Sequence, residues 1–355
     1  MLGRATVTGC LLFALFSSGC DSGRSTLVPA KPPSGDSSDE GSNEDLGAED
    51  GPEPTTVELN GHLKVTAGQL VNEAGNPIQL KGVSSMWLNW ESQAYAENAR
   101  ALRWMRNNWK LTVIRAAMGV EPPGAYLEVP EIARQQVYDI VDHAIEAGVY
   151  VVVDWHAHKA YEHTDEAVAF FSEIAAKYSG SPNVIYEPFN EPIEIGWADL
   201  KKYHEKVVEA IREQDADAPI VLGTPNYSQD VDMAAGDPVK GSNLLYTLHY
   251  YACTHKDALR RKGDIALSKG VALFVTEWGA THADGGRDGI VCLDSAQEWD
   301  DWLNAKKISW TAWKLDGCEP DSSCLLVPGA PVDGSWTDEY LHGHAKFVRG
   351  RMQQQ

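Results

Sequence analysis

The feature that most constrains the fold of this 355-residue sequence is an alternation of strand-like and helix-like segments after residue 80. Eight segments are short and apolar, and several are continuous apolar runs, as is typical of parallel strands covered on both faces. They are 80–85, 112–118, 149–156, 183–190, 219–224, 244–252, 272–280 and 308–315. Helical patterns separate them; one, 130–148, begins with Pro130 and stops at Gly148. This alternation predicts an α/β fold, a (β/α)8 TIM barrel rather than an open sheet.

The N-terminal part of the chain differs in composition from the rest. Residues 1–20 are typical of an export leader, with Arg4 before an apolar run, 10–16, that is too short to span a bilayer. The end of this run resembles a bacterial lipoprotein cleavage site in which Cys20 would be lipidated, although Ser17 stands where such sites usually carry Leu. Ordinary cleavage nearby and an uncleaved anchor are the alternatives. We therefore expect an exported protein, lipid-anchored to a bacterial membrane or cell surface, or otherwise secreted.

Residues 21–56 form an acidic segment rich in Ser, Gly and Pro, with nine acidic residues against Arg24 and Lys31. Charge repulsion and the lack of apolar residues predict a disordered linker. It would act as a tether or as a spacer without a role of its own. A catalytic domain is then expected over 57–355, and the turn residues within 62–80 predict a small N-terminal β-hairpin in front of the barrel.

The charge of the chain excludes some classes of partner. Its net charge of −21 is opposite to the basic footprint that nucleic-acid binding needs, and it also argues against binding to anionic membranes through charge alone. The twelve Trp residues are more than a core of this size requires, and flat indole surfaces suit ring-shaped ligands. We expect a monomer, with membrane association only through the lipid anchor.

Polar residues gather where the predicted strands end. In a parallel barrel these ends meet at one mouth, which is where the chemistry of such folds is found. Glu187 lies within the predicted strand 183–190 and Glu191 directly follows it, and we interpret Glu187 as a structural partner inside the barrel. The strand-end residues are Arg115, Asp154, His156, Asn190, Glu191, His249, Tyr251, Glu277 and Trp313.

Several of these residues lie in motifs that resemble a known family. "NEP" at 190–192 and "FVTEWG" at 274–279 resemble the acid/base and nucleophile motifs of glycoside hydrolase family 5, especially its bacterial endo-β-1,4-glucanases (cellulases). "VIRAAM", "VDWH", "SQDV", "LHYYA" and "ISWTAW" are also similar and occur in the same order. The resemblance extends over about residues 61–350.

The resemblance implies a role for each site residue. Glu191 would be the acid/base and Glu277 the nucleophile of a retaining, endo-acting enzyme that cleaves β-glucan in an open cleft without a cofactor or metal. Asn190 would hold the sugar 2-hydroxyl. Arg115 would lower the pKa of Glu277, whose charge would raise that of Glu191. The supporting residues are Arg115, His156, Asn190, His249, Tyr251, Trp313, Trp90 and Tyr227.

Three departures from the family pattern affect the expected sugar-binding positions. Met86 stands where the family often has His, Tyr227 replaces a Trp, and Cys318 stands where a Lys commonly lies. The catalytic set is intact, so these departures leave the reaction in place. They leave open whether mannan, xyloglucan or mixed-linkage glucan is the substrate.

The four Cys residues of the domain are an even number in an exported protein, which predicts two disulfides. Three pairings exist, and the short spacing favours Cys318–Cys324, which leaves Cys253 and Cys292 for the second.

Two rival functions were considered. His156 and His158 form an HxH pattern of the kind found in metal-dependent barrel hydrolases, but a metal centre there would leave Glu191 and Glu277 unexplained. A carbohydrate-binding surface protein without catalysis would not be expected to keep both Glu residues.

Overall fold

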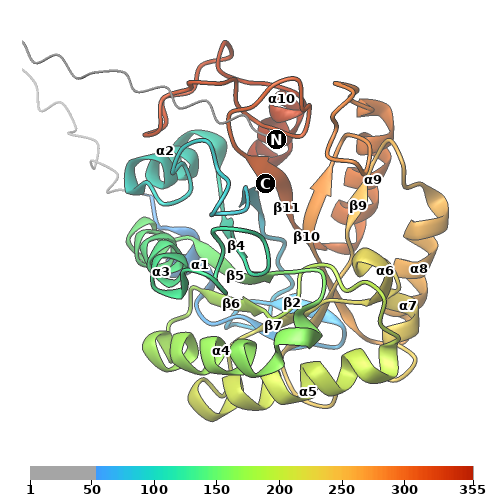
Figure 1. Ribbon diagram of the computed structural model, residues 1–355. Coiled ribbons are helices and arrows are strands. Elements are labelled where there is room, and N and C mark those ends of the chain that lie inside the picture. The colour runs from blue at the N-terminus through green and yellow to red at the C-terminus, as the bar shows by residue number, and fades with distance from the viewer. Residues whose placement is uncertain (1–52, 355) are drawn as a thin grey trace, which may run out of the picture. The chain divides into compact units, whose positions relative to one another are not determined.

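The computed structural model of the chain describes residues 53–354 (Figure 1). The predicted leader, Cys20 and nearly all of the predicted linker lie outside these residues. None of the helices within 53–354 combines the length and apolarity that a bilayer crossing requires.

The core of the domain is a closed barrel of eight parallel strands, which confirms the predicted fold (Figure 1). The strands pair in chain order, and pairing of the last with both its predecessor and the first closes the ring. They are β3 (Lys81–Ser85), β4 (Val113–Gly119), β5 (Tyr150–His156), β6 (Val184–Glu187), β7 (Ile220–Leu222), β8 (Leu244–Thr247), β10 (Ala272–Gly279) and β11 (Ser309–Leu315).

Helices cover the outside of the barrel, and the outward-facing side chains of the strands pack beneath them in one large apolar core. Local signals fix the helix ends: Asn98 caps the first long helix by accepting bonds from the backbone N–H groups of Arg100 and Ala101, and Gly148 ends another in the left-handed conformation. The main helices are α2 (Ala99–Trp109), α3 (Pro130–Ala147), α4 (Thr164–Tyr178), α5 (Trp197–Gln214), α8 (Asp257–Ser268), α9 (Leu293–Lys306) and α10 (Ala345–Gln353). Shorter elements are η1 (Ala160–His163), α6 (Pro225–Ser228) and α7 (Val231–Ala234).

Among the predicted strands that extend beyond the observed ones, two lie directly before site residues. β6 ends at Glu187, directly before Pro188, which has no N–H to give to a sheet. The segment predicted as 244–252 divides into β8 and the two-residue β9 (Tyr250–Tyr251), and His249 lies between them. In both places the chain leaves the barrel wall just where site residues follow.

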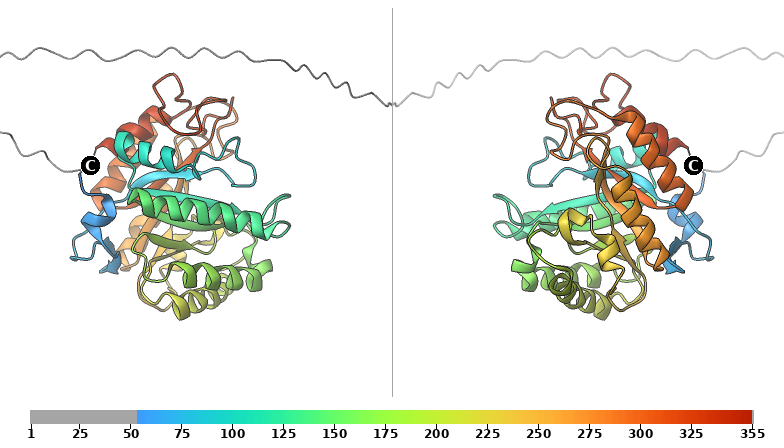
Figure 2. Two further views of the ribbon diagram at one scale, coloured as in Figure 1. Left: turned by 90° about the vertical axis from the view of Figure 1, so that its left-hand side faces the viewer. Right: turned by 90° about the vertical axis from the view of Figure 1, so that its right-hand side faces the viewer.

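The amino-terminal end of the barrel is closed by an apolar plug. The predicted hairpin is present as β1 (Lys64–Thr66) and β2 (Gln69–Val71), preceded by the short helix α1 (Thr56–Asn60). Figure 2 shows these elements, in blue, at one end of the barrel. Leu63 and Leu70 pack with the inward-facing side chains of the lower barrel. These side chains are Val113, Tyr150, Val152, Ile185, Val221, Leu245 and Phe274.

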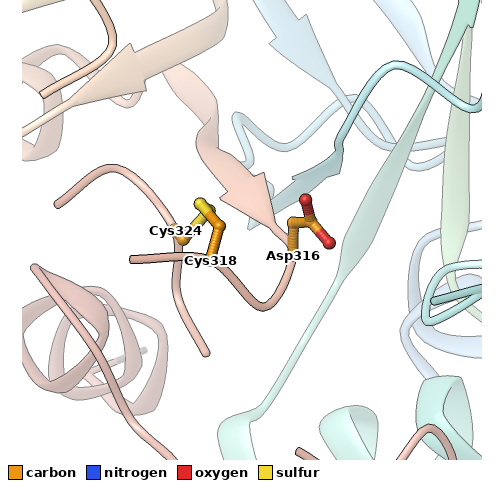
Figure 3. A group of neighbouring side chains, drawn as sticks. All are labelled: Asp316, Cys318 and Cys324. Carbon is orange, nitrogen blue, oxygen red and sulfur yellow. A yellow bond between two sulfur atoms is a disulfide. The ribbon is translucent and has the colours of Figure 1, made fainter. Parts of the chain in front are cut away.

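Two disulfides connect loops at the opposite, carboxyl end of the barrel. Cys253 bonds to Cys292, with Cα atoms 5.3 Å apart, and Cys318 bonds to Cys324, with Cα atoms 5.7 Å apart. This is the pairing that the spacing favoured. Figure 3 shows the second disulfide beside Asp316 in the loop after β11. Asp316 accepts hydrogen bonds from the backbone N–H and hydroxyl of Ser92, so this loop is also tied to the loop after β3.

Candidate active site

Arg115 lies in the upper barrel interior, the part towards the carboxyl ends of the strands, and is fully buried. Its guanidinium contacts Asp154 Oδ2 at 2.9 Å, Glu187 Oε2 at 2.8 Å and Glu277 Oε2 at 3.2 Å. It also donates to Oδ1 of Asn190 at 2.7 Å, which fixes the orientation of that amide. One cation therefore organises residues from β4, β5, β6 and β10.

Three carboxyl groups around one buried cation cannot all keep their ordinary acidity. Burial raises the pKa of Asp154 to about 7, although Arg115 opposes it, and burial also raises the pKa of Glu187. Burial alone would lower the pKa of Arg115, but the three carboxylates outweigh it and raise it. Arg115 therefore stays charged, and Glu187 is the interior structural partner that the sequence predicted.

Glu277 is held at both carboxylate oxygens. Tyr251 donates its hydroxyl to Oε1 at 2.6 Å, while Arg115 contacts Oε2. Burial and the charge of Glu277 raise the pKa of Tyr251, so its phenol keeps its proton and remains a donor. Two donors leave the carboxylate little freedom to rotate.

A local irregularity in β10 brings Glu277 inward. Thr276 bonds to Glu187 and Thr247 inside the barrel, and its neighbour Glu277 reaches Arg115 in the same interior. Successive residues of a regular strand would face opposite sides. The β10–β11 register shifts between Val275 and Trp278, which accounts for the exception.

Glu191 lies beyond β6 and contacts two imidazoles. His249 Nδ1 lies 3.0 Å from Oε1, and His158 Nε2 lies 3.4 Å from Oε2. His249 is fixed in turn by Thr276, whose hydroxyl is 3.0 Å from Nε2. Each oxygen of Glu191 therefore has its own histidine.

The predicted direction of the pKa shift of Glu191 is wrong. From the sequence, the charge of Glu277 was expected to raise this pKa. Burial does act to raise the pKa of Glu191, but the bonds from His158 and His249 outweigh burial and lower it. The same contacts raise the pKa of both imidazoles against the effect of burial. These contacts favour the carboxylate form of Glu191 and the protonated form of the imidazoles.

The two carboxyl groups are close together. An oxygen of Glu191, an oxygen of Glu277 and a ring nitrogen of His249 all lie within 4.8 Å of one another. Retaining glycosidases place their two carboxyl groups roughly 5–5.5 Å apart, whereas inverting enzymes leave roughly 6.5–9.5 Å for a water molecule. The separation fits the retaining class.

Aromatic rings lie close to the histidines around this pair. The ring of Trp313 stacks on His156 at 5.3 Å, and His156 Nδ1 lies 2.6 Å from Asp154 Oδ2. Burial and the charge of Arg115 lower the pKa of His156, so it is neutral. Trp90 is 52% exposed and Tyr227 is 46% exposed, so both rings are open to a ligand.

Tyr227 is presented by an unusual turn. Asn226, Tyr227 and Ser228 all have φ between 55° and 58°, a left-handed conformation that costs energy for residues other than Gly. Tyr227 donates its backbone N–H to Pro192 O at 3.1 Å, and the Ser228 hydroxyl donates to Asn190 O at 2.6 Å. Such strain persists where surrounding structure enforces it and is common at functional sites. Beside this turn is a hollow of about 490 Å³ that His158, Glu191, Gln229, His249, Tyr251 and His255 help to line.

The structure thus brings together all ten predicted site residues, but it separates the two histidines of the HxH pattern. The ring of His156 contacts the carboxyl group of Asp154, whereas the ring of His158 contacts the carboxyl group of Glu191. Within the described residues, neither belongs to a group of three acidic, His or Cys side chains with ligand atoms close enough for a metal. The sulfur atoms of Cys318 and Cys324, near Asp316, are bonded to each other.

Sequence reasoning missed three residues of the site. His158 was read only as part of a metal motif, although its place just after a strand end was a usable signal. Trp87 stacks on Trp90 with ring centroids 5.4 Å apart. Ser228 was quoted within a motif but not for the hydrogen bond that its hydroxyl donates to the carbonyl of Asn190.

A (β/α)8 barrel with two close carboxylates between exposed aromatic rings has the arrangement of a retaining glycoside hydrolase. The comparisons with known proteins agree with this class. The model of the family "Cellulase (glycosyl hydrolase family 5)" matches residues 71–319, and the chain belongs to this family.

The curated relatives of the chain are named endoglucanases. The chain is 41% identical over 303 residues to an endoglucanase of Clostridium saccharobutylicum, covering 84% of this chain and 66% of that protein. It is 39% identical over 300 residues to endoglucanase N of Pectobacterium atrosepticum, covering 83% and 66%. The chain therefore spans slightly less than two thirds of the length of these relatives.

Solved structures give a similar result. A structure from Cytophaga hutchinsonii is 40% identical, with a TM-score of 0.81 and coverage of 85% of this chain and 97% of that one. A glutamate-to-glutamine variant of the catalytic domain of a Thermobifida fusca endoglucanase, in complex with cellotetraose, is 31% identical with a TM-score of 0.79, covering 84% and 100%.

Proposed function

We propose that this chain is a retaining endo-β-1,4-glucanase in which Glu277 is the nucleophile and Glu191 the acid/base. The observation that carries the proposal is the short separation of the two carboxyl groups at the barrel mouth. Both oxygens of Glu277 are held, Oε1 by the Tyr251 hydroxyl and Oε2 by Arg115, and an oxygen of Glu191 lies within 4.8 Å of an oxygen of Glu277.

The reaction proceeds in two displacements. A Glu277 oxygen bonds to the anomeric carbon as the glycosidic C–O bond breaks, and Glu191 gives its proton to the leaving oxygen. A water molecule then bonds to the same carbon, Glu191 takes a proton from it, and the bond to Glu277 breaks. Configuration at the anomeric carbon is retained.

Asn190 and the histidines support these steps. Because Arg115 holds Oδ1 of Asn190, the Nδ2 donor is directed elsewhere and is suited to a sugar 2-hydroxyl. The proton that Glu191 delivers is shared between Glu191 and His249, whose Nδ1 lies 3.0 Å from Oε1. It moves to Glu191 when a sugar displaces water from the mouth and the charge-separated form loses its solvation.

The arrangement of the rings supports β-glucan as substrate. Trp90 and Trp313 provide flat surfaces on one side of the cut and Tyr227 on the other, so a polymer would lie across the mouth and be cut internally. The names of the relatives and the cellotetraose-bound neighbour point to the same substrate class.

The test uses residues 53–355 and measures reducing-sugar release from carboxymethylcellulose, barley β-glucan, xyloglucan and glucomannan. Carboxymethylcellulose or barley β-glucan should be cleaved fastest, with a rapid fall in viscosity. Proton NMR should show the β-anomer as the first-formed reducing end. An initial α-anomer would contradict the retaining mechanism, and slow viscosity loss with cellobiose as the early product would contradict internal cleavage.

We also propose that the protein is exported and lipid-anchored through Cys20. The support is the leader-like composition of residues 1–20. Labelled palmitate should enter the full chain but not a Cys20→Ser variant. Label in both proteins, or in neither, would contradict this part.

A further inference from the structure

His158 stands out because it contacts the carboxyl oxygen of Glu191 that His249 does not hold. Its Nε2 atom lies 3.4 Å from Oε2 of Glu191, while His249 lies 3.0 Å from Oε1. His249 is almost fully buried, but the side chain of His158 is 35% exposed and lines the hollow beside the acid/base. The two histidines therefore hold Glu191 from the interior and from the cleft.

The position of His158 is fixed by the surrounding loops. Its backbone N–H donates to Glu121 Oε2 at 3.2 Å, and its carbonyl accepts from the N–H of Ile193 at 3.2 Å, two residues past Glu191. Its ring stacks on Trp87, with centroids 5.9 Å apart, and meets the ring of Tyr227 edge-on at 6.3 Å. Backbone and ring contacts both direct this imidazole at Glu191.

We propose that His158 is a positioning residue for acid catalysis: it holds the second oxygen of Glu191 so that the carboxyl group faces the leaving-group oxygen. The terminal torsion of a Glu side chain is broad. With Oε1 alone anchored, the carboxyl group can rotate away from the bond to be cleaved. This inference rests on the proposed role of Glu191.

The charges around His158 suit this role. Carboxyl groups face it from Glu191, Glu121 and Glu277, and His156 is the neighbouring imidazole. Burial lowers the pKa of His158, but the bond with Glu191 and the three carboxylates outweigh burial and raise it. These contacts therefore favour the protonated imidazole, which can donate to Glu191.

The role predicts a dependence on the leaving group. A general acid contributes roughly 10²–10⁴-fold when the leaving group needs a proton. An activated aryl glycoside with a 2,4-dinitrophenolate leaving group needs none. A residue that only aims the acid should therefore matter for a sugar leaving group and not for dinitrophenolate.

The test compares kcat/KM, which reports the first displacement, for cellotetraose and 2,4-dinitrophenyl β-cellobioside. His158→Phe keeps an aromatic ring against Trp87 and Tyr227 but removes the donor. We expect its kcat/KM to fall about tenfold or more on cellotetraose and less than about twofold on the aryl glycoside. His158→Gln, which keeps a donor, should recover most of the loss. His163→Phe in η1 is the matched control and should change neither value.

Equal losses on both substrates, or no loss on either, would overturn the proposal. A second measurement does not depend on turnover: carbon-13 NMR of the Glu191 carboxyl group should show a higher pKa in His158→Phe than in the parent chain, because one lowering contact is gone. An unchanged Glu191 titration would also overturn it. Failure of the parent to cleave any β-glucan would instead count against the proposed function, so the two failures are distinguishable.

Discussion

The lower and upper parts of the barrel interior are built on the same strands but from opposite kinds of side chain. On β4, the inward-facing Val113 belongs to the apolar plug, and two residues further Arg115 contacts three carboxyl groups. On β10, Phe274 lies in the plug and Thr276 in the polar layer. A rise of two residues, about 6.6 Å, is enough to pass from one to the other.

The difference separates what holds the barrel together from what the barrel does. The lower interior gains free energy by removing apolar side chains from water. The upper interior places charges out of water, and even well-paired buried ions often stabilise no more than apolar residues of the same volume. The polar upper layer is therefore explained by the reaction and the apolar lower layer by the stability of the fold. Mutations in the upper layer should lower activity without lowering stability, and mutations in the lower layer should lower stability without lowering activity.

The largest expected effect is the loss of activity in Glu277→Gln. The variant keeps the shape of the side chain but removes the carboxylate that we propose as the nucleophile, so hydrolysis of carboxymethylcellulose should fall by several orders of magnitude. The melting temperature should stay the same or rise, because one of three carboxylates around Arg115 is neutralised. A variant that retains near-normal hydrolysis, or that unfolds readily, would break the division between the layers.

Phe274→Ala tests the lower layer. Truncating this fully buried ring should lower the free energy of unfolding by about 3–5 kcal/mol. Below the melting temperature, kcat and the pH profile should match those of the parent. Denaturant titration and kinetics at low temperature measure both, and Phe274→Leu serves as a milder control. A large change in kcat at full folding would show that the layers are coupled.

The disulfides allow a further test of the two layers, since both cross-link loop residues at the mouth of the barrel. Replacing Cys253 and Cys292 by Ser should cost about 4 kcal/mol, and replacing Cys318 and Cys324 about 2 kcal/mol, because the first pair closes the longer loop, with separations of 39 and 6 residues. Hydrogen exchange should speed up in the carboxyl-end loops and stay slow in β1 and β2. Faster exchange confined to the hairpin would contradict this picture.

The smallest expected effect is a pH-dependent contribution from the contact between Glu191 and His158. The raised pKa of His158 means that this contact stabilises the fold below the ordinary imidazole pKa of 6.5 and that the contribution is lost as pH rises through the raised value. The lowered pKa of Glu191 means that the contribution is present above 4.5 and is lost as pH falls through the lowered value.

The melting-temperature difference between the parent and His158→Gln should therefore be largest between pH 4.5 and 6.5. It should correspond to less than about 1 kcal/mol, since His158 is partly solvated. A difference that does not vary with pH would mean that His158 contributes by packing alone.

Much of the architecture followed from patterns that repeat along the chain. Apolar runs alternating with helical spacing predicted the eight strands, and the polar residues at their ends predicted a site that contains Arg115, Glu191 and Glu277. The rest depends on contacts between loops that no local pattern encodes. The left-handed turn at 226–228 contains no Gly, so its sequence gives no signal for this conformation. The predicted direction of the Glu191 pKa shift was wrong because two imidazoles set its sign. One of them, His158, comes into contact with Glu191 only because of the path of the loop after β5.

The short helix α1 fixes the place where the chain enters the domain. Thr55 and Glu58 cap it reciprocally, and the N–H of Val57 donates to the carbonyl of Gly148 at 3.2 Å, at the same end of the barrel as the plug. The chain thus enters the domain at the face opposite the catalytic mouth. A partner or tag joined to the chain just before Thr55 would therefore start at this base and not at the cleft. For the same reason, a shortened protein should begin before Thr55, since a start at residue 57 discards a cap worth about 1 kcal/mol.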